Sequence, residues 1–123
     1  MMSKIGHFRE LRVWQGGMDI VLAVYRLSGQ FPKSELYGLT SQLRRAAVSV
    51  PSNIAEGHTR ATTKEYLNSV SIAQASLAEV ETQLEISARL GYLPGTGLAA
   101  ALTQTNSLGK QLYALRDALK KRI

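Results

Sequence analysis

The sequence contains no cysteine, and its 123 residues include only two histidines. Without cysteine the chain has no disulfide framework, no thiolate metal ligand and no cysteine nucleophile. The absence also fits a reducing compartment, so we expect a cytoplasmic protein. His7 and His58 are the only imidazole ligands, and no glutamate has a histidine three residues later, as ferritin-like metal bundles require. We therefore expect no metal and no cofactor.

The chain also lacks a long apolar run. The longest stretch without a charged residue, 90–109, contains Pro94 and four glycines, which excludes a transmembrane helix there. The first residues lack the charged-then-apolar order of a secretory signal peptide. We therefore expect no membrane partner and no export by that route.

Sequence motifs of common enzyme classes are missing as well. There is no Gly-x-Ser-x-Gly motif, no phosphate-binding glycine-rich loop with lysine, and no dinucleotide-binding fingerprint. Glu81 and Glu85 lie one helical turn apart and could act as paired carboxylates. Amphipathic helices routinely carry such glutamates on a solvated face. We therefore expect a protein that is not an enzyme.

What the sequence does contain is helical periodicity. Apolar residues recur at intervals of three and four in long segments separated by short turns rich in Gly, Pro and Thr, and no useful length alternates as a strand does. In the first segment this face consists of Leu11, Trp14, Met18, Val21 with Leu22, and Tyr25. The pattern predicts an all-α, antiparallel up-and-down four-helix bundle. It forms a single domain over 1–123, with helices at roughly 9–29, 35–58, 63–90 and 97–121.

Residues near the predicted helix ends match known capping signals. Ser34 is the expected cap of the second helix, Thr62 forms a capping box with Glu65 at the third, and Thr96 caps the fourth. Pro51 interrupts the second helix, because a proline inside a helix removes one backbone hydrogen bond and clashes with the preceding turn. It predicts either a kink near residues 47–51 or two shorter helices.

Positive charge exceeds negative charge. Fifteen lysines and arginines against nine acidic residues give a net charge of +6 at pH 7. The third helix is acidic by contrast, and such asymmetry suits contacts to phosphates, although a basic last helical turn also simply complements the helix dipole. Chosen for charge and expected exposure rather than for a motif, the candidate nucleic-acid-binding residues are Arg9, Arg12, Arg60, Lys110, Arg116, Lys120 and Lys121.

The second helix has a further stripe opposite its apolar face. Small and hydrogen-bonding residues recur there at intervals of four and three: Gly38, Gln42, Arg45, Ser49, Ser52 and Glu56. Another helix could approach this stripe closely, with Arg45 and Glu56 finding charged partners across the contact. Within one helix these two lie about 16 Å apart and cannot pair with each other. The stripe predicts a subunit interface or an intrachain network, with a water-facing polar surface as the alternative.

Several segments together resemble a known family. They are FRELRVWQ at 8–15, Phe31-Pro32, Glu35 with Tyr37-Gly38-Leu39, the run QLRRAAVSVPSNIAEG at 42–57, and LGYL at 90–93. Over most of its length the chain resembles the bacterial four helix bundle proteins, also called the 23S rRNA-intervening sequence protein family. Two departures are Ala75, where the family often has glycine, and Gly16-Gly17, which should weaken the first helix.

The resemblance implies an antiparallel four-helix protomer, often assembled as a ring-shaped pentamer, without established catalysis. The chain is also similar to the accessory variability protein of diversity-generating retroelements, a basic pentameric barrel that engages nucleic acid and a reverse transcriptase. We therefore expect a homo-oligomer, by resemblance a pentamer, that binds RNA or DNA with low specificity. The alternative is a scaffold for a protein partner, or an accessory subunit for a nucleic-acid enzyme such as a reverse transcriptase.

Overall fold

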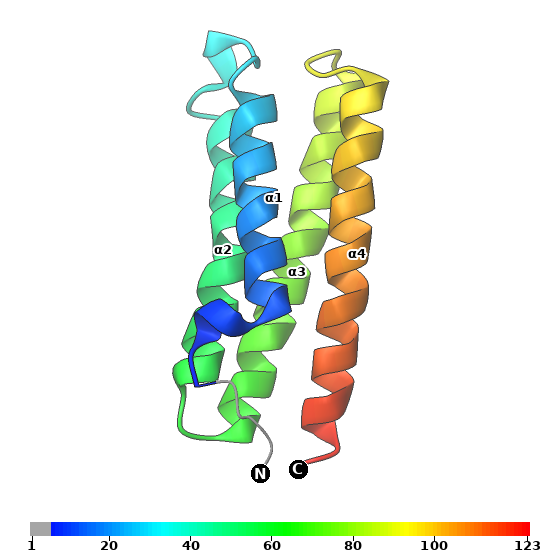
Figure 1. Cartoon of the computed structure of the whole chain (residues 1–123). Helices are drawn as coiled ribbons and strands as arrows, with labels where there is room; N and C mark the ends of the chain where they lie inside the picture. Colours follow the sequence, from blue (N-terminus) through cyan, green and yellow to red (C-terminus); the bar gives the residue numbers. More distant parts are fainter. Residues whose placement is uncertain (1–5) are drawn as a thin grey trace.

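The computed structural model describes residues 6–123 and consists of long α-helices joined by short turns (Figure 1). Residues 1–5, on which the expectation about a signal peptide partly depends, lie outside the described residues. The helices are α1 (Arg12–Ser28), α2 (Leu39–Thr59), α3 (Thr63–Arg89) and α4 (Gly95–Lys120), and two short 3-10 helices, η1 (Phe8–Glu10) and η2 (Lys33–Glu35), precede α1 and α2. Residues 6–123 contain no strand. The predicted all-α four-helix bundle is confirmed.

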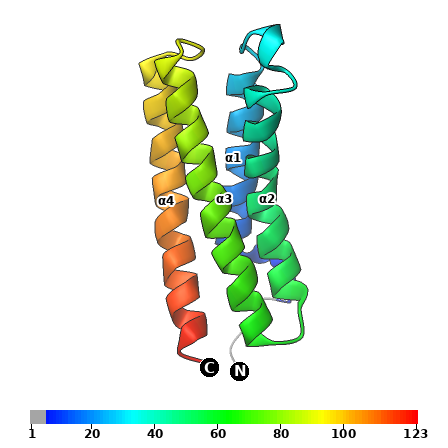
Figure 2. The same ribbon diagram turned by 180° about the vertical axis from the view of Figure 1, so that it is seen from behind.

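Consecutive helices run in opposite directions, as the colours in Figures 1 and 2 show. Each helix packs against two others, with α2 and α4 both lying beside α1 and α3. The end of α2, the start of α3 and the end of α4 consequently meet at one end of the bundle, whereas the shorter α1 starts short of that end. No described helix has the length and hydrophobicity that spanning a membrane requires.

The core contains apolar side chains that recur at helical spacing along α2, α3 and α4. Burying a leucine, isoleucine or valine side chain contributes roughly 1.5–3 kcal/mol, so these side chains dominate the stability of the fold. Fully buried members are Leu43, Val50 and Ile54 in α2, Val70, Val80 and Leu84 in α3, and Leu108, Leu112 and Leu119 in α4.

The first helix turns a different face to the core from the one expected. Its buried residues are Val13, Gly17, Ile20, Ala23, Val24 and Ser28. The predicted stripe lies to one side of these, so that Met18, Leu22 and Tyr25 are exposed. Leu11, Trp14 and Val21 of the predicted stripe are partly buried and pack against the core. The prediction fails for the other three because α1 carries two apolar stripes with helical spacing, and only one of them can face the bundle interior.

A glycine and a proline explain how closely α1 and α2 pack. A Cβ atom added at Gly17 would lie 3.2 Å from Cβ of Pro51, tighter than most real contacts. The absence of a side chain therefore lets α1 approach the proline ring. The helix α2 is assigned as one helix from Leu39 to Thr59 with Pro51 inside it, so the alternative of two shorter helices is wrong.

The first helix begins later than predicted because residues 8–10 form the separate 3-10 helix η1. His7 caps η1: its Nδ1 accepts a hydrogen bond from the backbone N–H of Arg9 at 3.2 Å, while the carboxylate of Glu10 accepts one from the N–H of His7 at 3.3 Å. Leu11 then has an extended backbone, and α1 starts at Arg12.

Two predicted caps are wrong and one is confirmed. Ser34 lies inside η2, and α2 starts only after Gly38, whose backbone (φ −116°, ψ −111°) is not helical. Thr96 lies inside α4, because Pro94 has an extended backbone and occupies the cap position. Thr62 does cap α3: its hydroxyl oxygen accepts a hydrogen bond from the N–H of Glu65 at 3.1 Å.

Candidate nucleic-acid interface

The alternating helix directions bring basic residues from different helices to one end of the bundle. Among the predicted residues, Arg9 lies in η1, which packs against α2, Arg60 follows α2, and Lys120 and Lys121 close α4. Lys64 in the first turn of α3 and Arg122 after α4 join them. Sequence reasoning left these two out of the candidate site, although the topology alone would have placed them there. All of these side chains are exposed. We call this surface the basic end: Arg9, Arg60, Lys64, Lys120, Lys121 and Arg122.

The pKa of a tyrosine reports how close α3 and α4 come at the basic end. Burial raises the pKa of the Tyr66 phenol, near the start of α3, because the phenolate would lose solvation there. The positive charge of Arg122, which follows α4, acts in the opposite direction and lowers that pKa. The charge of Arg122 is therefore felt across the gap between the two helix ends.

The positive charge of this end is little compensated by ion pairs. Between residues 6 and 123 the structure has two, Glu56 with Arg60 at 3.9 Å and Asp117 with Lys121 at 3.3 Å. Both join exposed side chains one helical turn apart, an arrangement worth only about 0.3–0.5 kcal/mol. Such weak pairs exchange readily for contacts to phosphates.

Contacts with its neighbours orient Arg9. Its guanidinium lies 3.0 Å from Nε2 of His7 and 5.1 Å from the ring centroid of Phe8. The backbone carbonyl of Arg9 accepts a hydrogen bond from the side-chain amide of Gln15 at 3.0 Å. Although exposed, this arginine is thus held against the surface of η1 and α1.

Three predicted residues do not belong to the basic end. Arg12 is exposed but lies beside the middle of α4, where it lines a hollow with Ser107 and Gln111. Arg116 is half-buried and donates a hydrogen bond to Oε1 of Gln74 in α3 at 3.3 Å, while its Nε is buried without a partner. The expectation that Arg116 is exposed is therefore wrong, since its side chain helps to join α3 and α4. Lys110 is exposed but lies ten residues before Lys120, about 15 Å away along the helix.

The polar stripe of α2 divides into contacting and free residues. Ser49 is half-buried, and its Oγ lies 2.8 Å from Oγ of Ser76 in α3. The side-chain amide of Asn53 donates to the carbonyl and to the hydroxyl oxygen of Ser49 at 2.8 and 3.0 Å. The stripe therefore takes part in an intrachain network at this one position. Gly38 is half-buried as well, whereas Gln42, Arg45, Ser52 and Glu56 are exposed.

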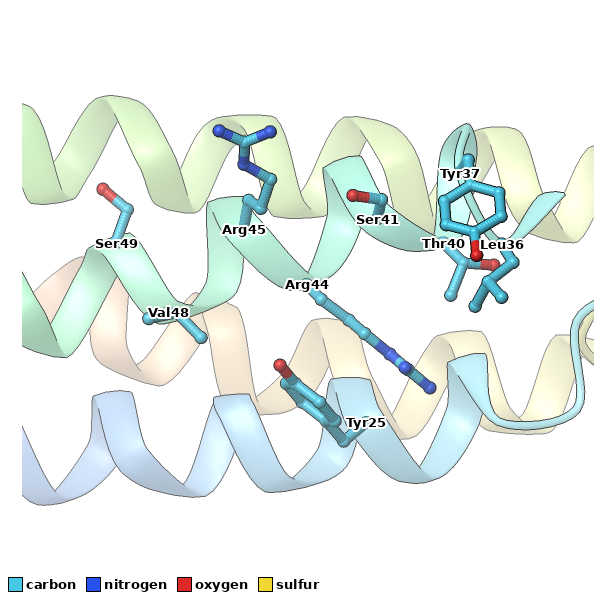
Figure 3. Close-up of a pocket in the computed structure, with 9 residues that line it drawn as sticks. All are labelled: Tyr25, Leu36, Tyr37, Thr40, Ser41, Arg44, Arg45, Val48 and Ser49. Carbon is cyan, nitrogen blue, oxygen red and sulfur yellow. The ribbon is translucent and has the colours of Figure 1, made fainter.

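A groove of about 660 Å³ lies on the outer surface of α1 and α2, toward the opposite end of the bundle (Figure 3). The guanidinium of Arg44 lies 4.5 Å from the ring centroid of Tyr25, and its Nε donates to Oγ of Ser28 at 2.8 Å. Tyr37 beside it is 94% exposed. We call this surface the α1–α2 groove: Tyr25, Leu36, Tyr37, Thr40, Ser41, Arg44, Arg45, Val48 and Ser49. Sequence reasoning missed it because it assigned Tyr25 to the core.

The glutamates considered as a catalytic pair have separate surroundings. Oε2 of Glu81 accepts a hydrogen bond from the hydroxyl of Thr105 in α4 at 2.7 Å, so this carboxylate links two helices. Glu85 is exposed. Within residues 6–123, no three side chains of the metal-binding types His, Cys, Asp or Glu come together.

These observations define the molecule as a helical bundle with one basic end and an open apolar groove. Residues 9–114 match the model of the 23S rRNA-intervening sequence protein family, and the chain belongs to this family. The match includes Arg9, Arg12, Arg60 and Lys110 and ends before the basic residues that close α4.

A solved structure has the same fold. It is a protein of unknown function from the S23 ribosomal protein family of Bacteroides thetaiotaomicron, with 18% sequence identity and a TM-score of 0.79. The similarity covers 85% of this chain and 95% of that one. At this identity the likeness concerns the fold alone. Among curated proteins, no sequence matches this chain.

Proposed function

We propose that this chain is a non-enzymatic, homo-oligomeric helical bundle that binds RNA or DNA with low sequence specificity through its basic end. The observation that supports this function is the meeting of basic residues from η1 and from the ends of α2, α3 and α4 on one surface. Lysine and arginine bind phosphates largely by releasing condensed counterions, which requires no base-specific contact. The absence of cysteine favours a cytoplasmic location.

Assembly of several copies would strengthen such binding. Five copies, the number that the family resemblance suggests, carry about +30 when each carries +6. Binding through several basic ends at once turns later contacts into intramolecular ones, so weak individual sites act together. The proposed oligomer thus explains how a surface without a binding motif would reach a useful affinity.

The α1–α2 groove favours a second candidate function, a scaffold or accessory subunit that binds a protein such as a nucleic-acid enzyme. Exposed apolar and aromatic side chains line this groove, as is typical of protein contacts. Salt dependence separates the two functions. Phosphate binding weakens steeply as salt rises, whereas an apolar protein contact changes little.

The test is a salt titration of binding to fluorescent single-stranded and duplex RNA and DNA, with nuclease-treated protein. The variant Arg60→Ser/Lys120→Ser/Lys121→Ser removes three charges from the basic end. We expect its affinity to fall at least tenfold. On duplex DNA the slope of log affinity against log salt should flatten by about 0.9 for each phosphate that the variant no longer neutralises.

A matched control removes three charges from the opposite end of the bundle, in the variant Arg26→Ser/Lys33→Ser/Arg89→Ser. These side chains are also exposed, so the change in net charge is the same. A much smaller loss of affinity in the control supports the basic end as the site. Equal losses would show that only the total charge matters, and no binding by the wild type at low salt would overturn the function.

A further inference from the structure

The apolar surface around the α1–α2 groove is larger than the groove itself. Leu22 and Met18 lie one and two turns before Tyr25 on the same face of α1, and Leu22 is 59% exposed. Gly17 packs against Pro51, and Arg44 bonds to Ser28. This antiparallel register places Leu22 beside the turn of α2 that contains Val48, which is also exposed. Contiguous apolar surface of this kind marks a site of interaction rather than a solvated face.

The groove is basic as well as apolar. Residues 36–55 include two arginines, Arg44 and Arg45, and no acidic residue. In Figure 3 their side chains point to opposite sides of α2, so the two guanidinium groups flank its outer surface. Arg45 is exposed and is in neither of the ion pairs found within residues 6–123. An occupant of this groove would therefore combine apolar side chains with carboxylates.

The chain itself carries a surface with these properties on α3. Residues 65–88 include four glutamates and neither lysine nor arginine. Exposed residues recur along this helix at intervals of three and four, and its two isoleucines are 44% and 43% exposed. We call this surface the α3 stripe: Ile72, Ala75, Glu79, Thr82 and Ile86. From first to last it spans about 21 Å of helix.

We propose that the α3 stripe of one copy docks into the α1–α2 groove of a second copy of this chain. The isoleucines of the stripe cover Leu22, Tyr25 and Val48, and Glu79 lies against Arg45 across the contact. The inference rests on the self-association proposed above and names the surfaces that produce it. Because the two surfaces differ, the contact is head-to-tail and repeats from copy to copy until a ring closes.

A charge exchange between chains tests this contact. Arg45→Glu and Glu79→Arg each place like charges opposite one another in every contact of a homo-oligomer. We expect each variant alone to weaken self-association at least tenfold, measured as molar mass against concentration by light scattering. An equal mixture of the two variants should reach a higher mass than either variant alone, because opposite charges then meet wherever the two kinds of chain alternate. In a ring of five, one contact still joins two chains of the same kind, so restoration is partial.

Mixing also excludes an effect within one chain. Arg45 and Glu79 lie on neighbouring helices of the same chain. In each variant positions 45 and 79 carry the same sign of charge, and mixing does not change this within a chain. Restoration therefore requires contact between copies. If the single variants dissociate and mixing restores nothing, the proposed pairing of the two surfaces is wrong.

An apolar substitution provides an independent measurement with its own control. Leu22→Asp should lower the mass, whereas Tyr113→Asp should not, because Tyr113 is similarly exposed (67%) but lies on α4 outside both surfaces. Circular dichroism confirms that each variant is folded. A wild type that is monomeric would overturn self-association and this interface together. An oligomer unchanged in every variant would overturn the interface alone and leave the proposed assembly and nucleic-acid binding standing.

Discussion

Gly57 lies where α2 packs closely against α3, and the substitution Gly57→Ala tests this packing. An added Cβ would lie 2.6 Å from Cβ of Ser69 and 3.0 Å from Cδ1 of Tyr66. Real Cβ atoms essentially never come closer than 3.0 Å to another heavy atom. A Cβ atom is fixed by its backbone, so Ser69 cannot rotate away. The two helices would have to separate instead.

The magnitude follows from two opposing effects. Alanine is favoured over glycine inside a helix by about 0.8–1.0 kcal/mol. Forcing an extra methyl group into a packed contact typically costs about 1–3 kcal/mol. Because this clash involves backbone-fixed atoms, we place its cost at the upper end and expect a net loss of roughly 1–2 kcal/mol. For a chain of this length, each kcal/mol lowers the melting temperature by about 3–6 °C.

Urea unfolding followed by circular dichroism measures the effect, and Gly109→Ala is the matched control. Gly109 also lies inside a helix, but the nearest atom to its added Cβ is Cδ2 of Leu77 at 3.8 Å, an ordinary contact. We expect this control to gain about 0.5–1 kcal/mol. The double variant Gly57→Ala/Ser69→Gly should lose less than the sum of its single variants, because it removes the clashing atom. A stability of Gly57→Ala equal to or above that of the wild type would refute the reasoning.

Three further substitutions probe single hydrogen bonds. Thr62→Ala removes the cap of α3 and should cost about 1 kcal/mol in urea unfolding. Ser49→Ala should lower the free energy of unfolding by about 1–2 kcal/mol because the hydroxyl of Ser76 loses its partner. Adding Ser76→Ala should cost little more, and additive losses would contradict a hydrogen bond between the two hydroxyl groups. The hydrogen bond from Tyr92 to Glu35 raises the pKa of Tyr92, so the folded state holds this proton more tightly than the unfolded state. The free energy of unfolding should therefore fall as pH rises above about 10. The loss between about pH 9 and about pH 11 should be smaller in Tyr92→Phe than in the wild type. Equal losses would show that Tyr92 is not the cause.

The sequence predicts α3 and α4 better than α1 for a physical reason. Helices α3 and α4 have one stripe that is apolar or small along most of its length, so the spacing identifies the buried face. In α1 the stripe of Met18, Leu22 and Tyr25 and the stripe of Gly17, Ile20 and Val24 both fit helical spacing. Larger side chains favour the first stripe, yet the core takes the second, in which Gly17 gives room to the proline ring of α2.

The sequence predicts the start of a helix correctly only where a nearby side chain caps it in a recognised pattern. Thr62 caps α3 through a residue three positions away, which is a signal within the sequence. At the start of α2 the carboxylate of Glu35 accepts a hydrogen bond from the N–H of Leu39 at 3.3 Å, so the acceptor is a glutamate four positions away and not the predicted Ser34. The start of α4 has no side-chain cap and follows the extended backbone of Pro94, so Thr96 is misleading as a cap.

The candidate site depends on partners that are distant in sequence. Arg116 bonds to Gln74, 42 positions away, and Ser49 to Ser76, 27 positions away. Neither partner is visible in a local pattern, so the sequence predicts an exposed Arg116 and does not decide which contact Ser49 makes. The basic end is different, because alternating helix directions and predicted helix ends already determine which termini meet. The helix topology is enough to predict which charged residues gather at this end, whereas predicting which of them are exposed requires knowing how the side chains pack.

The two proposals reinforce each other through symmetry. Copies in a closed head-to-tail ring are related by rotation about one axis. If the bundles stand along that axis, the same end of every copy lies on the same rim. The basic ends would then gather on one rim, and the substitutions that dissociate the ring should weaken nucleic-acid binding even though they lie far from the basic end. A variant such as Leu22→Asp, which leaves all basic residues in place, should therefore bind with a shallower salt slope than the wild type. An unchanged slope in a dissociated variant would show that a single basic end binds by itself.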